Sequence, residues 1–353
     1  MHTQSKFRLL VVRLGAMGDI LHALPAVTAL RQAHPSWVIN WVVEPRWRAL
    51  LAAQGAKERG PAMPVVDGLH LAATREWRSN SQVLKTLGEI QDLRQELRTV
   101  GYDTVIDLQG AIRSAVVARM TGAKRVIGED EPRERAARWL YSDRVATHAA
   151  HVIEQGIEIA EQVAGDELRP VSVPLPVDPE AETWCDALLA SSGTRPVALV
   201  NPGAGWGAKR WPVERFAAVA RGLMGRGFRV LVNAGPGEES MADVIVKEVS
   251  GAAIPLSTSL EQLIALTRRI ALCVAGDTGP LHLACALGRP VVGIYGPTDP
   301  SRNGPYGTRF KVLRNPESKR DHTRHPEPEA GLLTIAPEEV LRAADELLAE
   351  KAL

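Results

Sequence analysis

The stretch "FRLLVVRLGAMGDILHALPA" (residues 7–26) joins an apolar, partly β-branched run to two glycines, one acid and an apolar-periodic segment. The run at 7–13 is typical of a buried strand, and the segment from Ile20 to Ala33 has the spacing of a helix. A glycine turn joins them, which makes a strand, loop and helix, the repeating unit of a parallel sheet. The stretch therefore predicts an α/β fold, with Asp19 where the loop becomes a helix.

The same alternation of strand and helix recurs along the chain. Further strands are expected at 38–43, 103–108, 197–201, 228–233, 271–275 and 290–295. Helices are expected between Leu84 and Leu97 and after a capping box formed by Ser259 and Gln262. A connector at 169–180, whose four prolines disfavour a helix, separates two such series. We therefore expect two domains, each a doubly wound parallel sheet.

The domain limits follow from that connector. An amino-terminal domain is expected over residues 1–174 and a carboxy-terminal domain over 175–336. The length of 353 residues exceeds one ordinary hydrophobic core, which agrees with two domains. The terminal stretch 337–353 has one apolar face, so we expect a helix that packs onto one of the domains.

The composition excludes several classes of protein. Hydrophobic residues make up 45% and charged residues 24%, as in globular proteins, and the net charge of +1 gives no bulk attraction to nucleic acid. Three scattered cysteines form neither a disulfide framework nor a zinc motif. No signal peptide or long apolar segment is recognisable, so we expect a cytoplasmic protein.

Three loops follow predicted strands at the carboxyl edge of a sheet, where open α/β folds bind ligands. They are GAMGD (15–19), NPGAGWGAKRWP (201–212) and AGDTGPLHLA (275–284). No GxGxxG fingerprint or P-loop occurs in them, which disfavours nicotinamide and P-loop chemistry. Because the second and third loops follow strands of one predicted sheet, together they suit a diphosphate.

The polar residues of these loops each allow two interpretations. Asp19 suits a helix N-cap, which spacing alone favours, although one carboxylate can be both cap and base. The loop around Asp277 and Thr278 leads into a helix amino terminus that favours an anion, but a capped tight turn fits equally well. Lys209 either brings an ammonium group to the cradle or is solvated surface charge. His282 is more commonly a packed histidine than a catalyst.

Arginines concentrate in three segments of the amino-terminal half, 74–79, 109–115 and 131–144. Such a density suits an acceptor rich in carboxylate or phosphate. Acidic residues are interleaved with them, so salt-bridged helix surface is the simpler interpretation for most of these arginines.

The motifs RLGAMGDILHALPA, YDTVIDLQGAIRSA, PRERAARWLY, PGAGWGAKRWP, GPGEES and AGDTGPLHLACALGRPVVGIYGPTDPSRNGPYG run from residue 13 to about 307. Together they resemble the ADP-heptose:lipopolysaccharide heptosyltransferases, and the first three with the last resemble heptosyltransferase I. The resemblance implies a GT-B fold, in which two Rossmann-like domains face each other across a cleft. It implies that the amino-terminal domain binds the acceptor, that the carboxy-terminal domain binds the sugar nucleotide, and that helix 337–353 returns to the amino-terminal domain.

The resemblance also implies roles for single residues. Asp19 matches the catalytic base. The residues matched to donor binding are Gly203, Lys209, Glu238, Asp277, Thr278, Gly279 and His282, and those matched to acceptor binding are Gly18, Arg78, Arg113 and Arg133. Gly15 and Gly18 are then interpreted as room for the acceptor sugar. The segment GAGWGAK ahead of the lysine is closer to heptosyltransferase II.

The expected activity is an inverting transfer of L-glycero-D-manno-heptose from ADP-heptose to Kdo on the lipid A core. Transfer to the first heptose, a nucleotide-sugar epimerase or hydrolase, and a non-catalytic sensor are the alternatives. We expect no cofactor and no essential metal, since no metal-binding DxD motif is evident. The implied protein is a monomer in transient contact with the inner face of the inner membrane.

Overall fold

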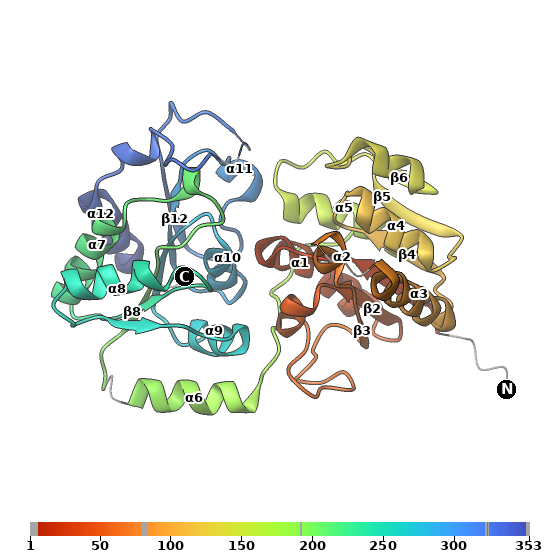
Figure 1. The fold of residues 1–353 in the computed structure, drawn as a ribbon, viewed down its shortest axis with the longest axis horizontal. Coiled ribbons are helices and arrows are strands. Elements are labelled where there is room, and N and C mark those ends of the chain that lie inside the picture. The colour runs from red at the N-terminus through yellow and green to blue at the C-terminus, as the bar shows by residue number, and fades with distance from the viewer. Residues whose placement is uncertain (1–5, 80–82, 191–192, 322, 324, 351–353) are drawn as a thin grey trace. The chain divides into compact units, whose positions relative to one another are not determined.

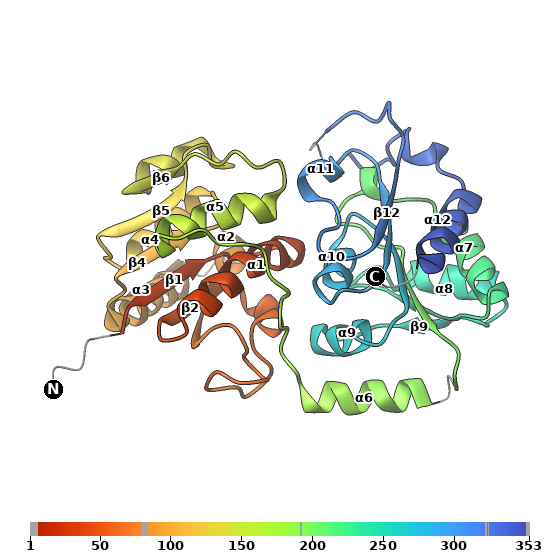
Figure 2. The ribbon, with the colours of Figure 1, turned by 180° about the vertical axis from the view of Figure 1, so that it is seen from behind.

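The computed structural model describes residues 6–79, 83–190, 193–321, 323 and 325–350, which form two compact units. The first unit ends at Val177, where the sequence predicted a boundary at 174, and the second begins at Asp178. Residues 167–178 form neither helix nor strand, in agreement with their prolines. Figures 1 and 2 show a sheet flanked by helices in each unit.

The first unit contains a six-stranded sheet, parallel throughout, in the order β3-β2-β1-β4-β5-β6. The strands are β1 (Arg8–Val12), β2 (Val38–Val43), β3 (Gly68–Leu71), β4 (Thr104–Asp107), β5 (Arg125–Glu129) and β6 (Asp143–Val145). The order reverses between β1 and β4, and ligands bind at such a switch point. The sequence predicted β1, β2 and β4 but not the outer strands β3, β5 and β6, whose apolar residues are interrupted by histidine, glycine or charged residues.

Helices cover both faces of this sheet. On one face, α1 (Met17–Ala33) packs against α5 (Val152–Ala164). On the other face, a single apolar core joins the strands to a second group of helices. We call this group the α3/α4 layer, and it comprises α2 (Thr74–Ser79), α3 (Val83–Val100), α4 (Ile112–Met120) and the 3₁₀ helix η2 (Arg135–Leu140). The short η1 (Pro45–Leu50) follows β2.

The second unit repeats the topology, with the sheet order β12-β11-β10-β7-β8-β9. Its strands are β7 (Val197–Asn201), β8 (Arg229–Asn233), β9 (Ile254–Leu256), β10 (Leu272–Gly276), β11 (Val291–Tyr295) and β12 (Phe310–Arg314). Counted within each unit, both sheets therefore have the strand order 3-2-1-4-5-6. The predicted pair of doubly wound parallel sheets is confirmed, although β9 and β12 were not predicted.

The helices of the second unit begin close to the positions that the sequence indicates. The predicted capping box is confirmed, because Gln262 N donates to Ser259 Oγ at 3.2 Å and Ser259 N donates to Gln262 Oε1 at 3.0 Å. The helices are α6 (Pro179–Ala190), α7 (Val213–Gly225), α8 (Glu239–Glu248), α9 (Leu260–Thr267), α10 (Gly279–Ala286) and α11 (Pro300–Asn303), with the 3₁₀ helices η3 (Gly207–Lys209) and η4 (Leu332–Thr334).

The terminal helix α12 (Pro337–Ala349) packs on the second unit, so the expectation that it returns to the first is wrong. Val340, Ala344 and Leu347 enter the same apolar core as α7, and α12 also contacts β11 and β12. An ion pair between Arg226 and Asp345, with Nε–Oδ1 at 2.6 Å, lies beside it. The apolar face of the helix is thus covered by its own unit.

Candidate functional site

Asp19 lies in the first turn of α1, with its side chain 40% exposed. Ala16, not Asp19, occupies the N-cap position, so the N-cap interpretation is wrong by three residues because the helix begins earlier than predicted. The carboxylate still serves the helix end, since Ala16 N donates to Asp19 Oδ2 at 3.0 Å. Asp19 therefore combines a capping bond with an accessible carboxylate.

Arg13, at the end of β1, holds the other oxygen of this carboxylate. Its Nη2 lies 3.1 Å from Asp19 Oδ1, and its Nη1 donates to the carbonyl oxygen of Leu108. Gln109 makes a second connection, because its Oε1 accepts from Leu14 N at 2.8 Å. The loops after β1 and β4 are thereby joined at the switch point, and Asp19 is oriented from that junction. The sequence analysis quoted Arg13 within a motif but gave it no role.

The glycines of the first loop differ in their surroundings. A Cβ atom on Gly15 would lie 2.7 Å from Trp47 Nε1, so an indole ring already fills the space beside this glycine. The interpretation of Gly15 as room for a sugar is therefore wrong. Gly18 is half-buried in the first turn of α1, adjacent to Asp19.

Asp107, the last residue of β4, organises the loop that follows. It is fully buried, and its carboxylate accepts hydrogen bonds from Gln109 N at 2.8 Å, Ser114 Oγ at 2.8 Å and Tyr141 Oη at 2.9 Å. Burial raises the pKa of Asp107 above its ordinary value, although these hydrogen bonds act in the opposite direction. Three segments, the β4 loop, α4 and the turn after η2, are thus fixed around one carboxyl group.

Two of the three predicted acceptor arginines come from segments that meet at this edge. A Cβ atom on Gly110 would lie 3.1 Å from Arg133 N, and Glu134 N donates to Gly110 O at 2.9 Å. Glu134 also caps α4, because Ile112 N donates to its Oε2 at 2.9 Å. Arg113 is exposed in the first turn of α4, and Arg133 is exposed in the loop.

Some of the other arginines of these segments form salt bridges on the surface, as the simpler interpretation of the sequence expected. Arg138 and Arg144 lie 3.0 Å and 3.7 Å from Asp130 Oδ1, as ion pairs on the surface. Arg78 belongs to α2, but its side chain lies outside the described residues. The described part of the site therefore presents Arg113 and Arg133.

In the second unit, the loops after β7 and β10 meet around Asp277. Lys209 Nζ forms an ion pair with Asp277 Oδ2 and also donates to the carbonyl oxygen of Asp277 at 3.3 Å. His282 Nε2 lies 3.0 Å from Asp277 Oδ1. The ammonium group also stands over the indole of Trp206, 4.2 Å from the ring centroid. Lys209 is therefore not solvated surface charge, since its side chain is only 12% exposed.

Asp277 owes its charge to these neighbours. Burial by itself would raise the pKa of Asp277, but the hydrogen bond from His282 and the positive charge of Lys209 outweigh burial and hold the pKa well below its usual range. A buried carboxylate repels phosphate, so its use here is to fix Lys209 and His282 in place. The predicted residues Lys209, Asp277 and His282 thus form one cluster.

Thr278 and Gly279 set the start of α10. Thr278 is the N-cap residue, and its Oγ1 donates to the carbonyl oxygen of Gly276 at 3.2 Å instead of capping the helix with its side chain. The helix begins at Gly279 at the carboxyl end of β10, directly beside the Lys209–Asp277 pair. An anion placed there meets both a helix amino terminus and an ammonium group.

Gly203 and Glu238 also come together. A Cβ atom on Gly203 would lie 1.9 Å from Glu238 Oε2, so a larger residue at this position would displace the carboxylate of Glu238. Gly235 N donates to Glu238 Oε2 at 3.2 Å and holds the side chain there. Beneath them, Asn233 Nδ2 donates to Asn201 Oδ1 at 3.0 Å. The two asparagines, missed by the sequence analysis, are polar residues at the ends of otherwise apolar strands.

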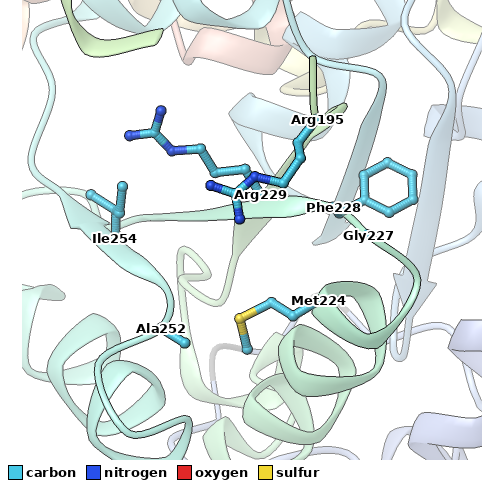
Figure 3. A pocket seen from close by; sticks show the side chains of 7 residues that line it. All are labelled: Arg195, Met224, Gly227, Phe228, Arg229, Ala252 and Ile254. Carbon is cyan, nitrogen blue, oxygen red and sulfur yellow. The ribbon is translucent and has the colours of Figure 1, made fainter. Parts of the chain in front are cut away.

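A pocket of about 500 Å³ lies elsewhere in the second unit (Figure 3). Arg195, Phe228, Arg229 and Ile254 line it, together with Met224, Gly227 and Ala252. Arg229 and Ile254 are the first residues of β8 and β9, so this pocket lies at the amino ends of the strands. The carboxyl edge, which carries Lys209 and Asp277, is the opposite edge of the same sheet.

The described residues contain neither a cluster of side chains suited to a metal ion nor a helix suited to spanning a membrane. No group of three or more histidine, cysteine, aspartate or glutamate side chains is placed to hold a metal ion in that part of the chain. Within the same residues, no helix combines the length and the apolar character that crossing a bilayer requires.

Comparison with known proteins identifies the family. The model of glycosyltransferase family 9 (heptosyltransferase) matches residues 90–332. The chain belongs to this family. The heptosyltransferases that the sequence motifs resemble belong to this family, so the expectation of a glycosyltransferase is confirmed.

Individual relatives agree with this placement. The chain is 30% identical over 306 residues to lipopolysaccharide heptosyltransferase 1 of Pseudomonas aeruginosa, covering 85% of this chain and 81% of that protein. It is 26% identical over 324 residues to lipopolysaccharide heptosyltransferase 2 of Escherichia coli K12, covering 87% and 88%. A structure of the E. coli heptosyltransferase WaaC with ADP has a TM-score of 0.78 and 26% identity, covering 97% of this chain and all of that one. The GT-B fold class is thereby confirmed.

Proposed function

We propose that this family 9 glycosyltransferase moves L-glycero-D-manno-heptose from ADP-heptose to Kdo on the lipid A core, with inversion at the anomeric carbon. The observation that carries the proposal is the pair of opposite charges at equivalent loops. Asp19 offers an accessible carboxylate after β1, and Lys209 offers a fixed ammonium group after β7. Transfer of a sugar from a diphosphate to a hydroxyl group needs a base that takes the proton of the hydroxyl and a cation that stabilises the departing diphosphate.

Asp19 is the proposed base. Its accessible carboxylate takes the proton of the attacking hydroxyl as the sugar gains oxocarbenium character. Arg13 fixes Oδ1, and the amide of Ala16 fixes Oδ2, which limits the carboxylate to one orientation. Holding a catalytic group in one orientation lowers the entropic part of the activation barrier.

Lys209 and the amino terminus of α10 are the proposed partners of the departing ADP. Negative charge grows on the diphosphate as the glycosidic bond breaks, and a pre-oriented ammonium group stabilises that charge most in the transition state. Asp277 and Trp206 hold the ammonium before the donor arrives. His282, Thr278, Gly279, Gly203 and Glu238 complete the proposed donor site.

On the acceptor side, Arg113 and Arg133 with Arg78 are proposed to bind the acidic sugar, and Gly18 to leave space next to Asp19. Arginine suits a carboxylate because its guanidinium group can form two parallel hydrogen bonds. The acceptor is an amphiphile, so we place the enzyme, as a monomer, at the cytoplasmic face of the inner membrane.

Transfer of the first heptose is favoured over transfer of the second by the higher identity to a heptosyltransferase 1, 30% against 26%. The test incubates the protein with ADP-heptose and either Kdo-lipid A or heptosyl-Kdo-lipid A, and mass spectrometry identifies which acceptor gains a heptose. A gain only on the heptosylated acceptor would assign the second transfer. Release of ADP without any acceptor would indicate a hydrolase or epimerase.

Asp19→Asn tests the base within the same assay. The amide keeps a capping oxygen but cannot accept the proton, so kcat should fall by about 10² to 10⁴ while thermal stability changes little. Near wild-type turnover would leave Asp19 with a capping role alone. We also expect EDTA to leave the wild-type rate unchanged, since Lys209 and α10 supply positive charge to the leaving group; loss of activity restored by Mn²⁺ would contradict this.

A further inference from the structure

The α3/α4 layer of the first unit exposes large apolar side chains. Apart from Val177 at the unit's end, those that are exposed among its described residues lie on β3, α3, α4 and η2, and they are Leu71, Val83, Leu84, Leu87, Ile112, Val116 and Trp139. Leu84 is 85% exposed and Trp139 78%. By contrast, the large apolar side chains of α1 and α5 on the other face are covered. Exposure is therefore confined to one layer.

Helix α3 shows how this exposure arises. Its apolar stripe is continuous in sequence, but only its carboxyl half reaches the core, where Leu93 and Leu97 are buried. Leu84 and Leu87, in the first turns, extend the same stripe into solvent. Because α3 begins on the side where β3 ends, this uncovered half lies at the carboxyl edge of the sheet, as do the acceptor loops.

Positive charge accompanies the apolar side chains. Helix α4 exposes Ile112 and Val116 beside Arg113 and Arg119, and it contacts both α3 and η2. Residues 112–120 and 135–140 together contain four arginines and no acidic residue. Apolar side chains beside an excess of arginines suit an interface where acyl chains lie under anionic headgroups; the acidic residues of the surface, Glu89, Asp92 and Glu96, all lie on α3.

We propose that the exposed surface of α3, α4 and η2 rests on an anionic lipid bilayer. This inference depends on the proposed function, which supplies a lipid-linked acceptor. The exposed leucines of α3 and Trp139 enter the headgroup region, and the exposed Arg119 of α4 and Arg135 of η2 contact phosphates. A second copy of the chain fits less well, because a two-fold contact through this surface would set the same four arginines against each other.

The test compares Leu84→Ser/Leu87→Ser with the matched control Val244→Ser/Leu333→Ser, whose exposed side chains lie in the second unit. Sedimentation with vesicles of phosphatidylethanolamine and phosphatidylglycerol measures binding. The α3 variant should bind at least about tenfold more weakly than the wild type, and the control within about twofold. Binding by Arg119→Gln/Arg135→Gln should also fall, and added salt should weaken wild-type binding. Wild-type vesicle binding by the α3 variant would overturn the proposal.

Transfer assays separate this inference from the proposed function. The α3 variant should lose most transfer to acceptor embedded in vesicles but keep wild-type transfer to a water-soluble, deacylated acceptor. Equal loss on both acceptors would overturn a bilayer role, and so would a wild-type dimer in sedimentation velocity that the α3 variant abolishes. If the wild type transfers heptose to neither acceptor, the proposed function fails, whereas vesicle binding still decides the surface.

Discussion

Asp107 and Asp277 lie at the carboxyl ends of corresponding strands in two sheets of equal strand order: Asp107 is the last residue of β4, and Asp277 directly follows β10. Both are buried, with 0% and 8% of their surface exposed. Their pKa values nevertheless move in opposite directions. Burial raises that of Asp107, whose partners are hydroxyl and backbone N–H groups, whereas His282 and Lys209 lower that of Asp277 in spite of burial. Position and burial do not decide charge; the neighbouring cations do.

The difference separates a carboxyl group held by hydroxyl and backbone N–H groups from one paired with an ammonium group and an imidazole. Asp107 joins the β4 loop, α4 and the turn after η2, and its four hydrogen bonds stay within the protein. Asp277 instead holds the largely buried ammonium group of Lys209, which belongs to the loop after β7. The loops after β1 and β7 also differ in charge, since the first carries the carboxylate of Asp19 and the second the ammonium group of Lys209.

Removing the Asp277 charge should have the larger effect. Asp277→Asn leaves Lys209 without its counter-charge and His282 without its carboxylate partner, and breaking such a buried ion pair should lower the free energy of unfolding by about 3 kcal/mol. Urea unfolding measures the loss, with exposed Asp243→Asn as control. Calorimetry should also show weaker ADP binding, because Lys209 loses its fixed position. A change below about 1 kcal/mol would mean that the pair is not a net stabiliser.

Asp107→Asn should cost less. No cation loses its partner, and the hydroxyls of Ser114 and Tyr141 can reverse to accept from the new amide, so a loss of about 1 kcal/mol is expected. The same urea titration measures it. ADP affinity should stay at the wild-type value, because Asp107 lies in the other unit. A loss of unfolding free energy equal to that of Asp277→Asn would show that the neighbouring cation does not explain the difference between the two carboxyl groups.

The smallest expected effect is on pH dependence, where the two variants should have opposite signs. The folded-state pKa of Asp277 is lowered, so its stabilisation is present above its unfolded pKa and is lost as pH falls further. The folded-state pKa of Asp107 is raised, so its stabilisation is complete below the unfolded pKa and is lost as pH rises. Unfolding between pH 3 and 7 should therefore show the wild type losing its advantage over Asp277→Asn in acid and gaining relative to Asp107→Asn. Parallel curves would contradict the opposite shifts.

Sequence reasoning succeeded where apolar runs and special residues lie close together in the chain. The inner strands, the capping box at Ser259 and the proline connector followed from local preferences. The outer strands β3, β5, β6, β9 and β12 did not, because histidine, glycine, proline or charged residues interrupt their apolar residues. The destination of α12 was also wrong, since an apolar face indicates that a helix packs but not on what.

The residues of the candidate site also differ in whether the sequence alone could predict them. Glycine loops after strands pointed to the segments of Asp19, Lys209 and Asp277, while their roles came from family resemblance. Arg13 and Asp107 were not assigned, because their partners are distant in sequence. Arg13 meets the carbonyl oxygen of Leu108 only when β1 and β4 are neighbours, and Asp107 meets Tyr141 across 34 residues.

The two α/β units, the connector between them and the family can be predicted from the linear chain, because strand and helix periodicity and motif spacing are properties of it. Which charges meet depends on the folded arrangement of the strands. Only the parallel order of the strands brings Lys209 to Asp277 and leaves Asp107 without a cation. Electrostatic interaction depends on distance and burial, and both are fixed by the folded strands and not by separation along the chain.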